Sequence, residues 1–208
     1  MNLLSALKVL QSVGIPIMET GDVAYKLGLS NEHASQVLRR LAMEKHVIHL
    51  SRGLWVIDLQ VNPLIIPEYL VAPFPCYVSL QTALYHHGMI NQIPRIITVV
   101  SLARTRLIKT PLATISVHHI SSDFFFDYEL DLKTQVKMAT PEKALLDVFY
   151  LRPAKSLWFK SLPEVEIEPS FDAKKAFGMI QKIPSKSRRT VVEGALRSLL
   201  SHSASSKP

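Results

Sequence analysis

The first third of the chain carries apolar residues at the spacing of amphipathic helices. Between Leu3 and Val13 they recur every three or four positions, and the pattern stops near Gly14, which predicts a first helix. A second helix is predicted to begin with Thr20 as its N-cap and to end at Gly28, where glycine favours a left-handed C-cap. Two short, closely spaced helices are therefore expected at the start of the chain.

A third helix is predicted directly after this turn, with Ser30 as its N-cap. Its inward stripe consists of Ala34, Val37, Leu38 and Leu41. The opposite side is polar and carries Asn31, His33, Ser35, Gln36, Arg39 and Arg40. Two helices joined by a short turn that contains glycine are typical of the helix-turn-helix motif.

After Lys45 the pattern changes to two short β-rich runs, 47–50 and 54–57. The residues between them, Ser51 to Gly53, predict a hairpin in which glycine supplies the backbone angle that the turn needs. A hairpin directly after the third helix is a wing in the winged helix-turn-helix arrangement. We therefore predict that residues 1–60 form a winged helix-turn-helix DNA-binding domain.

The remainder, 61–208, is predicted to form a mixed α+β domain with its core in 76–200 and a frayed tail over 201–208. The Pro-rich segment 58–75 favours an ordered connector over a flexible tether. Thr140-Pro141-Glu142-Lys143 is a strong helix opening, with Thr as N-cap and Pro at the first helical position. Further helices are expected near 79–88, 172–181 and 190–200, and strands near 96–101, 114–120 and 135–138.

The charge of the chain favours a polyanionic partner. The net charge is +7, and a positive surface attracts phosphates and releases their counterions on binding. Six Lys and Arg stand against five Asp and Glu up to Asn62, a net charge of +1, so most of the excess lies beyond. A DNA-binding face on the first domain must therefore depend on where its charges lie.

The third predicted helix supplies the candidate DNA contacts, because the major groove accepts one α-helix. Base contacts are predicted for Ser35, Gln36 and Arg39. Backbone contacts are predicted for Asn31, His33, Arg40, Lys45 and the wing-tip Arg52. A solvent-exposed helix face with no DNA contact is the simpler alternative.

Two basic groups in the larger domain are candidates for further phosphate contacts. Between 95 and 109 there are four basic residues and no acidic one, and another basic group lies in 182–189. Arg104, Arg106, Lys109, Arg188 and Arg189 are the predicted backbone contacts. Solvated basic loops that only keep the protein soluble remain the alternative.

We predict no catalytic or metal site and no cofactor. The chain has no glycine-rich phosphate loop, G-x-S-x-G elbow or H-E-x-x-H motif. Neighbours such as His118 and His119 point to opposite faces of a strand, so each such pair offers one metal ligand at most. Lys143 and Asp147 are interpreted as a simple helix pair. Convergence of Asp123, Asp127, Glu129 or Glu142 in a cleft, with strongly raised pKa values, would instead indicate an enzyme.

The sequence is expected to belong to a cytoplasmic protein that is not in a membrane. Cys76 is the only cysteine and is interpreted as a small, semi-buried apolar residue. The most apolar stretch, 61–74, contains three prolines and Glu68, so it cannot cross a bilayer as one helix.

Several runs of the chain resemble the AbiEi antitoxin family. They are Tyr77-Val78-Ser79-Leu80, Ala83-Leu84-Tyr85-His86-His87-Gly88, Gln92-Ile93-Pro94, Thr98-Val99-Val100, 115–120 and Ala139-Thr140-Pro141-Glu142-Lys143-Ala144-Leu145-Leu146-Asp147. The resemblance covers most of 1–150. It implies a type IV toxin-antitoxin component that represses its own operon and counters a nucleotidyltransferase-like toxin.

Together these patterns favour a sequence-specific autorepressor that acts as an antitoxin. Its expected partners are double-stranded DNA of its own promoter, with an inverted repeat, and a nucleotidyltransferase-like toxin. The alternative is a non-enzymatic interaction module, or a solitary regulator, whose winged helix binds a partner protein. The oligomeric state is left open.

Overall fold

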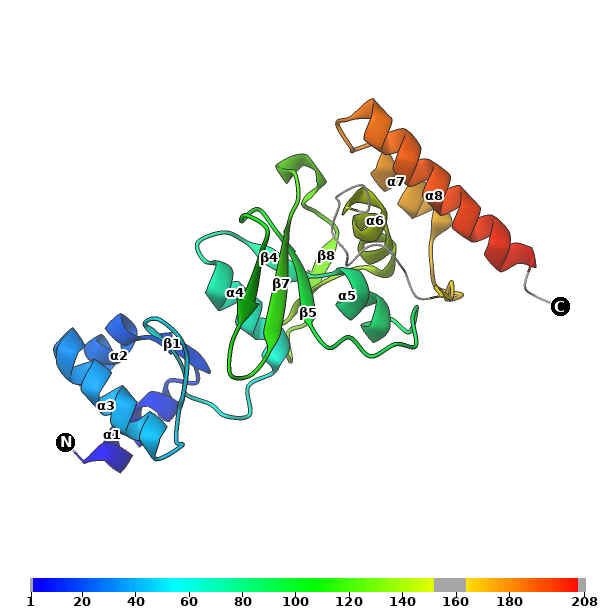
Figure 1. The fold of residues 1–208 in the computed structure, drawn as a ribbon. Coiled ribbons are helices and arrows are strands. Elements are labelled where there is room, and N and C mark those ends of the chain that lie inside the picture. Colours follow the sequence, from blue (N-terminus) through cyan, green and yellow to red (C-terminus); the bar gives the residue numbers. More distant parts are fainter. Residues whose placement is uncertain (1, 152–163, 206–208) are drawn as a thin grey trace. The chain divides into compact units, whose positions relative to one another are not determined.

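The computed structural model describes residues 2–151 and 164–205 of the chain (Figure 1). It is a mixed α+β structure that divides into two compact units. The N-terminal unit comprises residues 1–70 together with 109–113, and the C-terminal unit comprises 71–108 and 114–208. Within the described residues, the helices are too short or too polar for any of them to cross a membrane.

The N-terminal unit consists of three helices and a small sheet. In chain order its elements are α1 (Leu3–Ser12), β1 (Ile17–Glu19), α2 (Thr20–Leu27), α3 (Asn31–Met43), β2 (Ile48–Ser51) and β3 (Leu54–Val56). The strands are antiparallel in the order β1-β3-β2, with Ile17 opposite Val56 and Ile48 opposite Val56 on the other side. The predicted helices and hairpin are therefore present, and β1 is an additional strand that the sequence pattern did not indicate.

Local signals account for most of the helix ends. The Ser30 side chain accepts a hydrogen bond from the His33 N–H at 3.2 Å, as expected of an N-cap. Gly28 ends α2 in the left-handed conformation, with φ of 63°. The prediction for Thr20 was wrong, because the N-cap of α2 is Glu19, whose N–H donates to the Asp22 carboxylate at 3.2 Å.

The core of the N-terminal unit lies between its helices and its hairpin. Leu10, Leu38 and Leu41 are completely buried, and Val37 packs beside them. Trp55 of β3 closes this cluster from the sheet side. The inward stripe predicted for the third helix is thus confirmed, which leaves the opposite side of α3 to solvent.

The C-terminal unit is built around a six-stranded sheet. Its strands are β4 (Cys76–Val78), β5 (Ile97–Ser101), β6 (Arg106–Lys109), β7 (Thr114–His119), β8 (Tyr128–Leu130) and β9 (Lys137–Ala139). They lie in the order β6-β7-β5-β4-β9-β8. The sheet is mixed, because β5 pairs with β7 and β4 with β9 in parallel, whereas β4 with β5 and β8 with β9 are antiparallel.

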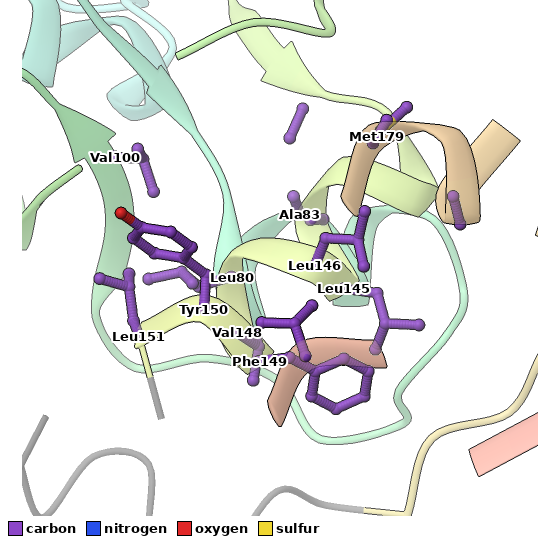
Figure 2. Packing of buried hydrophobic residues seen from close by; sticks show 14 of the residues in the cluster. Leu80, Ala83, Val100, Leu145, Leu146, Val148, Phe149, Tyr150, Leu151 and Met179 are labelled. Atoms are coloured by element: carbon purple, nitrogen blue, oxygen red, sulfur yellow. The ribbon is translucent and has the colours of Figure 1, made fainter. Parts of the chain in front are cut away.

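The four longer helices of this unit are α5 (Leu80–His86), α6 (Pro141–Leu151), α7 (Ala173–Ile180) and α8 (Lys186–Ser205). Of these, α5 and α6 pack on the sheet, and α7 and α8 pack on α6, which contacts the other three (Figure 1). Every α6 residue after Pro141 is buried. Figure 2 shows the side chains of this core: Leu80 and Ala83 from α5, Val100 from β5, Leu145, Leu146, Val148, Phe149, Tyr150 and Leu151 from α6, and Met179 from α7.

Several predictions for the C-terminal unit need correction. The strands β4, β6 and β8 were not expected, and the Pro-rich connector contains a short 3-10 turn (Pro63–Ile65) and α4 (Ile66–Val71). The last helix begins at Lys186 rather than near 190 and continues to Ser205, so 201–205 is helical rather than frayed. Residues 206–208 of the predicted tail lie outside the described residues.

Candidate nucleic-acid interface

The outward side of α3 presents the polar residues on which the sequence prediction depends. Asn31, His33, Gln36, Arg39 and Arg40 are exposed. Ser35 is only half-buried, so it also remains accessible in part. Because the buried stripe faces the core, these side chains share the solvent side of one helix, which is the arrangement that a groove-reading helix requires.

The end of α3 adds a cation beside this face. Lys45 is exposed and has a left-handed backbone, with φ of 61°, directly after the last turn. The exposed acidic residues Glu32 and Glu44 reduce the positive charge of the same helix. The Glu44 carboxylate lies 3.6 Å from His46 Nε2. The face is therefore polar and only moderately basic.

The hairpin turn is fixed to the start of α2. The Thr20 hydroxyl donates to the Gly53 carbonyl at 3.2 Å, and the Thr20 N–H donates to the same oxygen at 2.8 Å. Trp55 Nε1–H in turn donates to the Thr20 hydroxyl at 3.0 Å. These bonds hold the turn that carries the exposed Arg52, so Arg52 has a fixed relation to the helices of its own unit.

Sequence reasoning missed several residues of this unit. It treated Thr20 as a helix cap, whereas Thr20 connects α2 to the hairpin. It also passed over Tyr25 on α2 and Met43 at the end of α3, which are 84% and 83% exposed. The available signal was their position outside the inward stripes of their helices, which predicts exposed side chains.

The basic residues predicted in the larger domain lie on separate elements of the structure. Arg104 is exposed in a loop, whereas Arg106 and Lys109 belong to β6, an edge strand, and not to a loop. Arg188 and Arg189 lie in the first turn of α8 and are only partly exposed. The structure thus brings the α3 candidates together on one helix and leaves the other basic candidates dispersed.

Two of the four acidic residues named as enzyme candidates lie together around one lysine. Asp127 and Glu142 both pair with Lys175, at 3.0 and 3.4 Å, while Asp123 and Glu129 are exposed. Lys175 thereby links α7 to the start of α6 and to the segment before β8. This arrangement stabilises the packing of α7.

Lys143 and Asp147 form an ion pair in the interior and not on the surface. Both side chains are completely buried. Asp147 also accepts hydrogen bonds from the Tyr77 hydroxyl at 3.0 Å and the Ser79 hydroxyl at 2.8 Å. Burial lowers the pKa of Lys143 and raises the pKa of Asp147, while the attraction between the two charges opposes both shifts. The pair is therefore enclosed in the interior of the C-terminal unit.

The paired histidines divide between the two faces of β7 as strand geometry requires. His118 is buried and bonds to Ser116 at 2.9 Å, and burial lowers its pKa from 6.5 to about 4. His119 is exposed, with its Nδ1 3.2 Å from the Leu102 carbonyl. Among residues 2–151 and 164–205, three potential ligands nowhere gather closely enough to hold a metal ion.

Comparison of the chain with protein-family models gives no match, and comparison with curated protein sequences gives none either. A function for this chain therefore has to be inferred from its residues and its fold. The feature that carries most information is the polar side of α3 beside a fixed basic hairpin tip.

Proposed function

We propose that this chain is a sequence-specific DNA-binding regulator whose N-terminal unit is a winged helix. The observation that carries the proposal is the solvent-exposed polar side of α3, which lies in the same unit as a hairpin whose tip presents Arg52. In this proposal α2 and α3 are the helix-turn-helix and β2-β3 is the wing. DNA is the expected partner of a protein with a net charge of +7, and the proposed place of action is the cytoplasm.

Base reading is assigned to the middle of α3. Arg39 can donate two parallel hydrogen bonds to guanine in the major groove, and Gln36 can pair in the same way with adenine. Ser35 is short and half-buried, so it suits a close approach of the helix to the base edges. Each good bidentate pair discriminates against a wrong base by about 1–3 kcal/mol.

Backbone contacts are assigned to residues around this centre. Arg40, Lys45 and Arg52 are exposed cations that can neutralise phosphates without reading sequence. Asn31 and His33 lie in the first turn of α3, where the helix dipole favours an anion. Because Thr20 fixes the hairpin turn, Arg52 has a defined position relative to α3. Arg104, Arg106, Lys109, Arg188 and Arg189 stay predictions for additional phosphate contacts.

The biological role that we propose is that of an autorepressor and antitoxin in a type IV toxin-antitoxin system. This part rests on the likeness of sequence runs to the AbiEi antitoxins. Except for Gln92-Ile93-Pro94, which lies in a loop, the runs coincide with β4, α5, β5, β7 and α6, and β4, α5, β5 and α6 contribute to the main core cluster of the C-terminal unit. The operator would be an inverted repeat in its own promoter, and the toxin partner would be nucleotidyltransferase-like.

The binding test compares the full chain with variants on a duplex from the region upstream of its own gene, by fluorescence anisotropy. Arg39→Ala should weaken binding by about 1–3 kcal/mol and relax the preference for one base pair. Arg52→Ala should weaken binding to all sequences alike and reduce the salt slope by about 1.

The matched control is Arg197→Ala, which removes a 67% exposed arginine side chain from α8. It should leave the affinity and the salt slope unchanged. If wild type, the Arg39→Ala, Arg52→Ala double variant and Arg197→Ala bound the duplex equally, the proposal would be wrong.

A partner protein for the same helix is the second candidate. Met43 is exposed at the end of α3 and Tyr25 on α2, and large exposed side chains of this kind are common at protein interfaces. In this case Met43→Ala would weaken capture of the product of the adjacent gene by the full chain while Arg39→Ala left DNA affinity unchanged. The opposite pattern favours the DNA proposal.

A further inference from the structure

The C-terminal unit has an open cavity whose lining includes Arg188, one of the predicted phosphate contacts. Its volume is about 480 Å³, which lies within the range of small-molecule sites. The lining residues come from the loop after β5, the end of β7, the following 3-10 turn, α6 and α8. They are Leu102, His119, Ser121, Ser122, Tyr150 and Arg188, with no acidic residue among them.

Arg188 is held in this cavity by an aromatic ring and not by an acid. Its guanidinium carbon lies 4.6 Å from the centre of the Tyr150 ring, and Tyr150 stacks in turn on Phe124 at 4.8 Å. Tyr150 lies at the opposite end of the core cluster from Met179 (Figure 2). Contact with a ring face uses none of the guanidinium N–H donors. Within the described part of the chain no carboxylate pairs with Arg188, so these donors are available to an oxyanion.

Further polar side chains line the same cavity. His119 Nδ1 contacts the carbonyls of Leu102 and Ala103 at 3.2 and 3.3 Å, so this nitrogen carries the proton, and Nε2 of the neutral ring is an acceptor that can take the hydrogen of a protonated phosphate. The Ser121 and Ser122 hydroxyls form no side-chain hydrogen bond with the residues that the structure describes. An arginine, two serines and a histidine therefore line one space.

We propose that this cavity binds the terminal phosphate of a small phosphomonoester. A phosphate offers several acceptor oxygens, and an arginine fork can pair with two of them. Leu102 supplies an apolar wall for the remainder of the ligand, since the Tyr150 ring is already covered by Arg188 and Phe124. Residues 173–192 contain no acidic side chain and six basic ones, of which Arg188 lines the cavity and Lys175 pairs with Asp127 and Glu142.

The partial burial of the site favours a small ligand over duplex DNA. Arg188 and Ser121 are only partly exposed, and Tyr150 is 7% exposed. A terminal phosphate can enter such a cavity, whereas a phosphodiester inside a duplex is attached on both sides. A small phosphomonoester and duplex DNA would both present a phosphate oxyanion to this site, and a competition experiment between the two ligands distinguishes them.

The test titrates the full chain with AMP, adenosine and inorganic phosphate by calorimetry. AMP and inorganic phosphate should bind, and AMP should bind at least tenfold more tightly than adenosine. Arg188→Gln should weaken AMP binding tenfold or more, and Ser121→Ala, which leaves the arginine-ring stack intact, threefold or more. Arg197→Gln, a neutralised arginine on the same helix that pairs with Glu193, should bind AMP like wild type.

Three results would overturn the proposal. The first is AMP binding no tighter than adenosine. The second is equal AMP affinity of Arg188→Gln, Ser121→Ala and Arg197→Gln. The third is displacement of AMP by a 20-base-pair duplex of unrelated sequence, together with an equal loss of duplex and AMP affinity in Arg188→Gln, since the cavity would then be a DNA phosphate contact. None of these results bears on the α3 contacts, which are tested with Arg39→Ala.

Discussion

Replacing Lys143 with Met tests whether the buried ion pair holds the C-terminal unit together. Met retains most of the apolar stem, and the Lys143 ammonium already lies 4.0 Å from the centre of the Phe124 ring. The substitution leaves the Asp147 carboxylate buried with only the Tyr77 and Ser79 hydroxyls as donors. Removing one partner of a buried pair typically destabilises a protein by about 3–5 kcal/mol.

Protonation of Asp147 sets an upper limit to this loss. For a carboxyl group with an ordinary pKa near 3.9, protonation costs roughly 4 kcal/mol at pH 7 and roughly 1.5 kcal/mol at pH 5. Without Lys143, burial raises the folded-state pKa of Asp147 further above its unfolded value, so the variant regains stability as the pH falls. We therefore expect Lys143→Met to lose up to about 4 kcal/mol at pH 7 and clearly less at pH 5.

Urea unfolding at both pH values measures the effect. Lys175→Met is the matched control, because Lys175 pairs with Asp127 and Glu142 but its side chain is 39% exposed, and it should lose about 1 kcal/mol or less. Adding Asp147→Asn to Lys143→Met should restore most of the stability, since Asn keeps an acceptor oxygen without the charge. A Lys143→Met variant as stable as wild type at pH 7 would refute the reasoning.

Three further predictions concern single positions. His118 is held neutral by burial, with its pKa lowered from 6.5 to about 4, so the unfolded chain gains a proton first and stability falls as the pH drops below 6.5. Between pH 7 and pH 4.5, His118→Gln should lose about 2–3 kcal/mol less of its free energy of unfolding than wild type does. Urea unfolding at both pH values measures this, and the same pH dependence in both proteins would contradict it. Gly28→Ala should lower the free energy of unfolding by about 1 kcal/mol, because φ of 63° is unfavourable for Ala, and Gly28→Asn should be closer to wild type. Equal free energies of unfolding for wild type and both variants would contradict this. Thr20→Val should destabilise the N-terminal unit by about 1–3 kcal/mol because Trp55 Nε1–H loses its acceptor, whereas Thr20→Ser keeps the acceptor and should be as stable as wild type. Thermal unfolding measures the difference, and equal stability of Thr20→Val and Thr20→Ser would contradict the prediction.

The helices of the N-terminal unit were predictable because their signals are local. Caps such as Ser30 and Gly28 lie within a few residues of the turns that they end, and the stripe around Leu38 repeats within one helix. β1 was not predictable in the same way. It has three residues, and its partner β3 lies almost forty residues further along the chain. A strand that short depends on its neighbour and not on its own pattern.

Charged residues account for two further errors, because their burial and pairing depend on distant parts of the chain. Lys143 and Asp147 have the spacing of an exposed helix pair, yet Tyr77 and Phe124 enclose them from other elements. Conversely, the charged run 106–109 was predicted as a loop and is an edge strand, where exposed Arg and Lys prevent pairing with other chains.

The two candidate sites differ in whether their residues are close together in the sequence. The outward side of α3 follows from one helix, so the sequence alone indicated Gln36, Arg39 and their neighbours. The cavity around Arg188 draws on five segments between 102 and 188, and the sequence pattern contains no signal that brings them together. The link from Thr20 to the hairpin turn also joins residues more than thirty positions apart.

The most direct measurement of the central claim is the ratio of two affinities of the wild-type chain at 150 mM salt. One is for a duplex from the region upstream of its own gene, and the other is for a shuffled duplex of equal length and composition. A regulator that reads bases through α3 should bind its own duplex more tightly by a factor of about 10³ or more. Equal affinities for the two duplexes would contradict sequence-specific recognition.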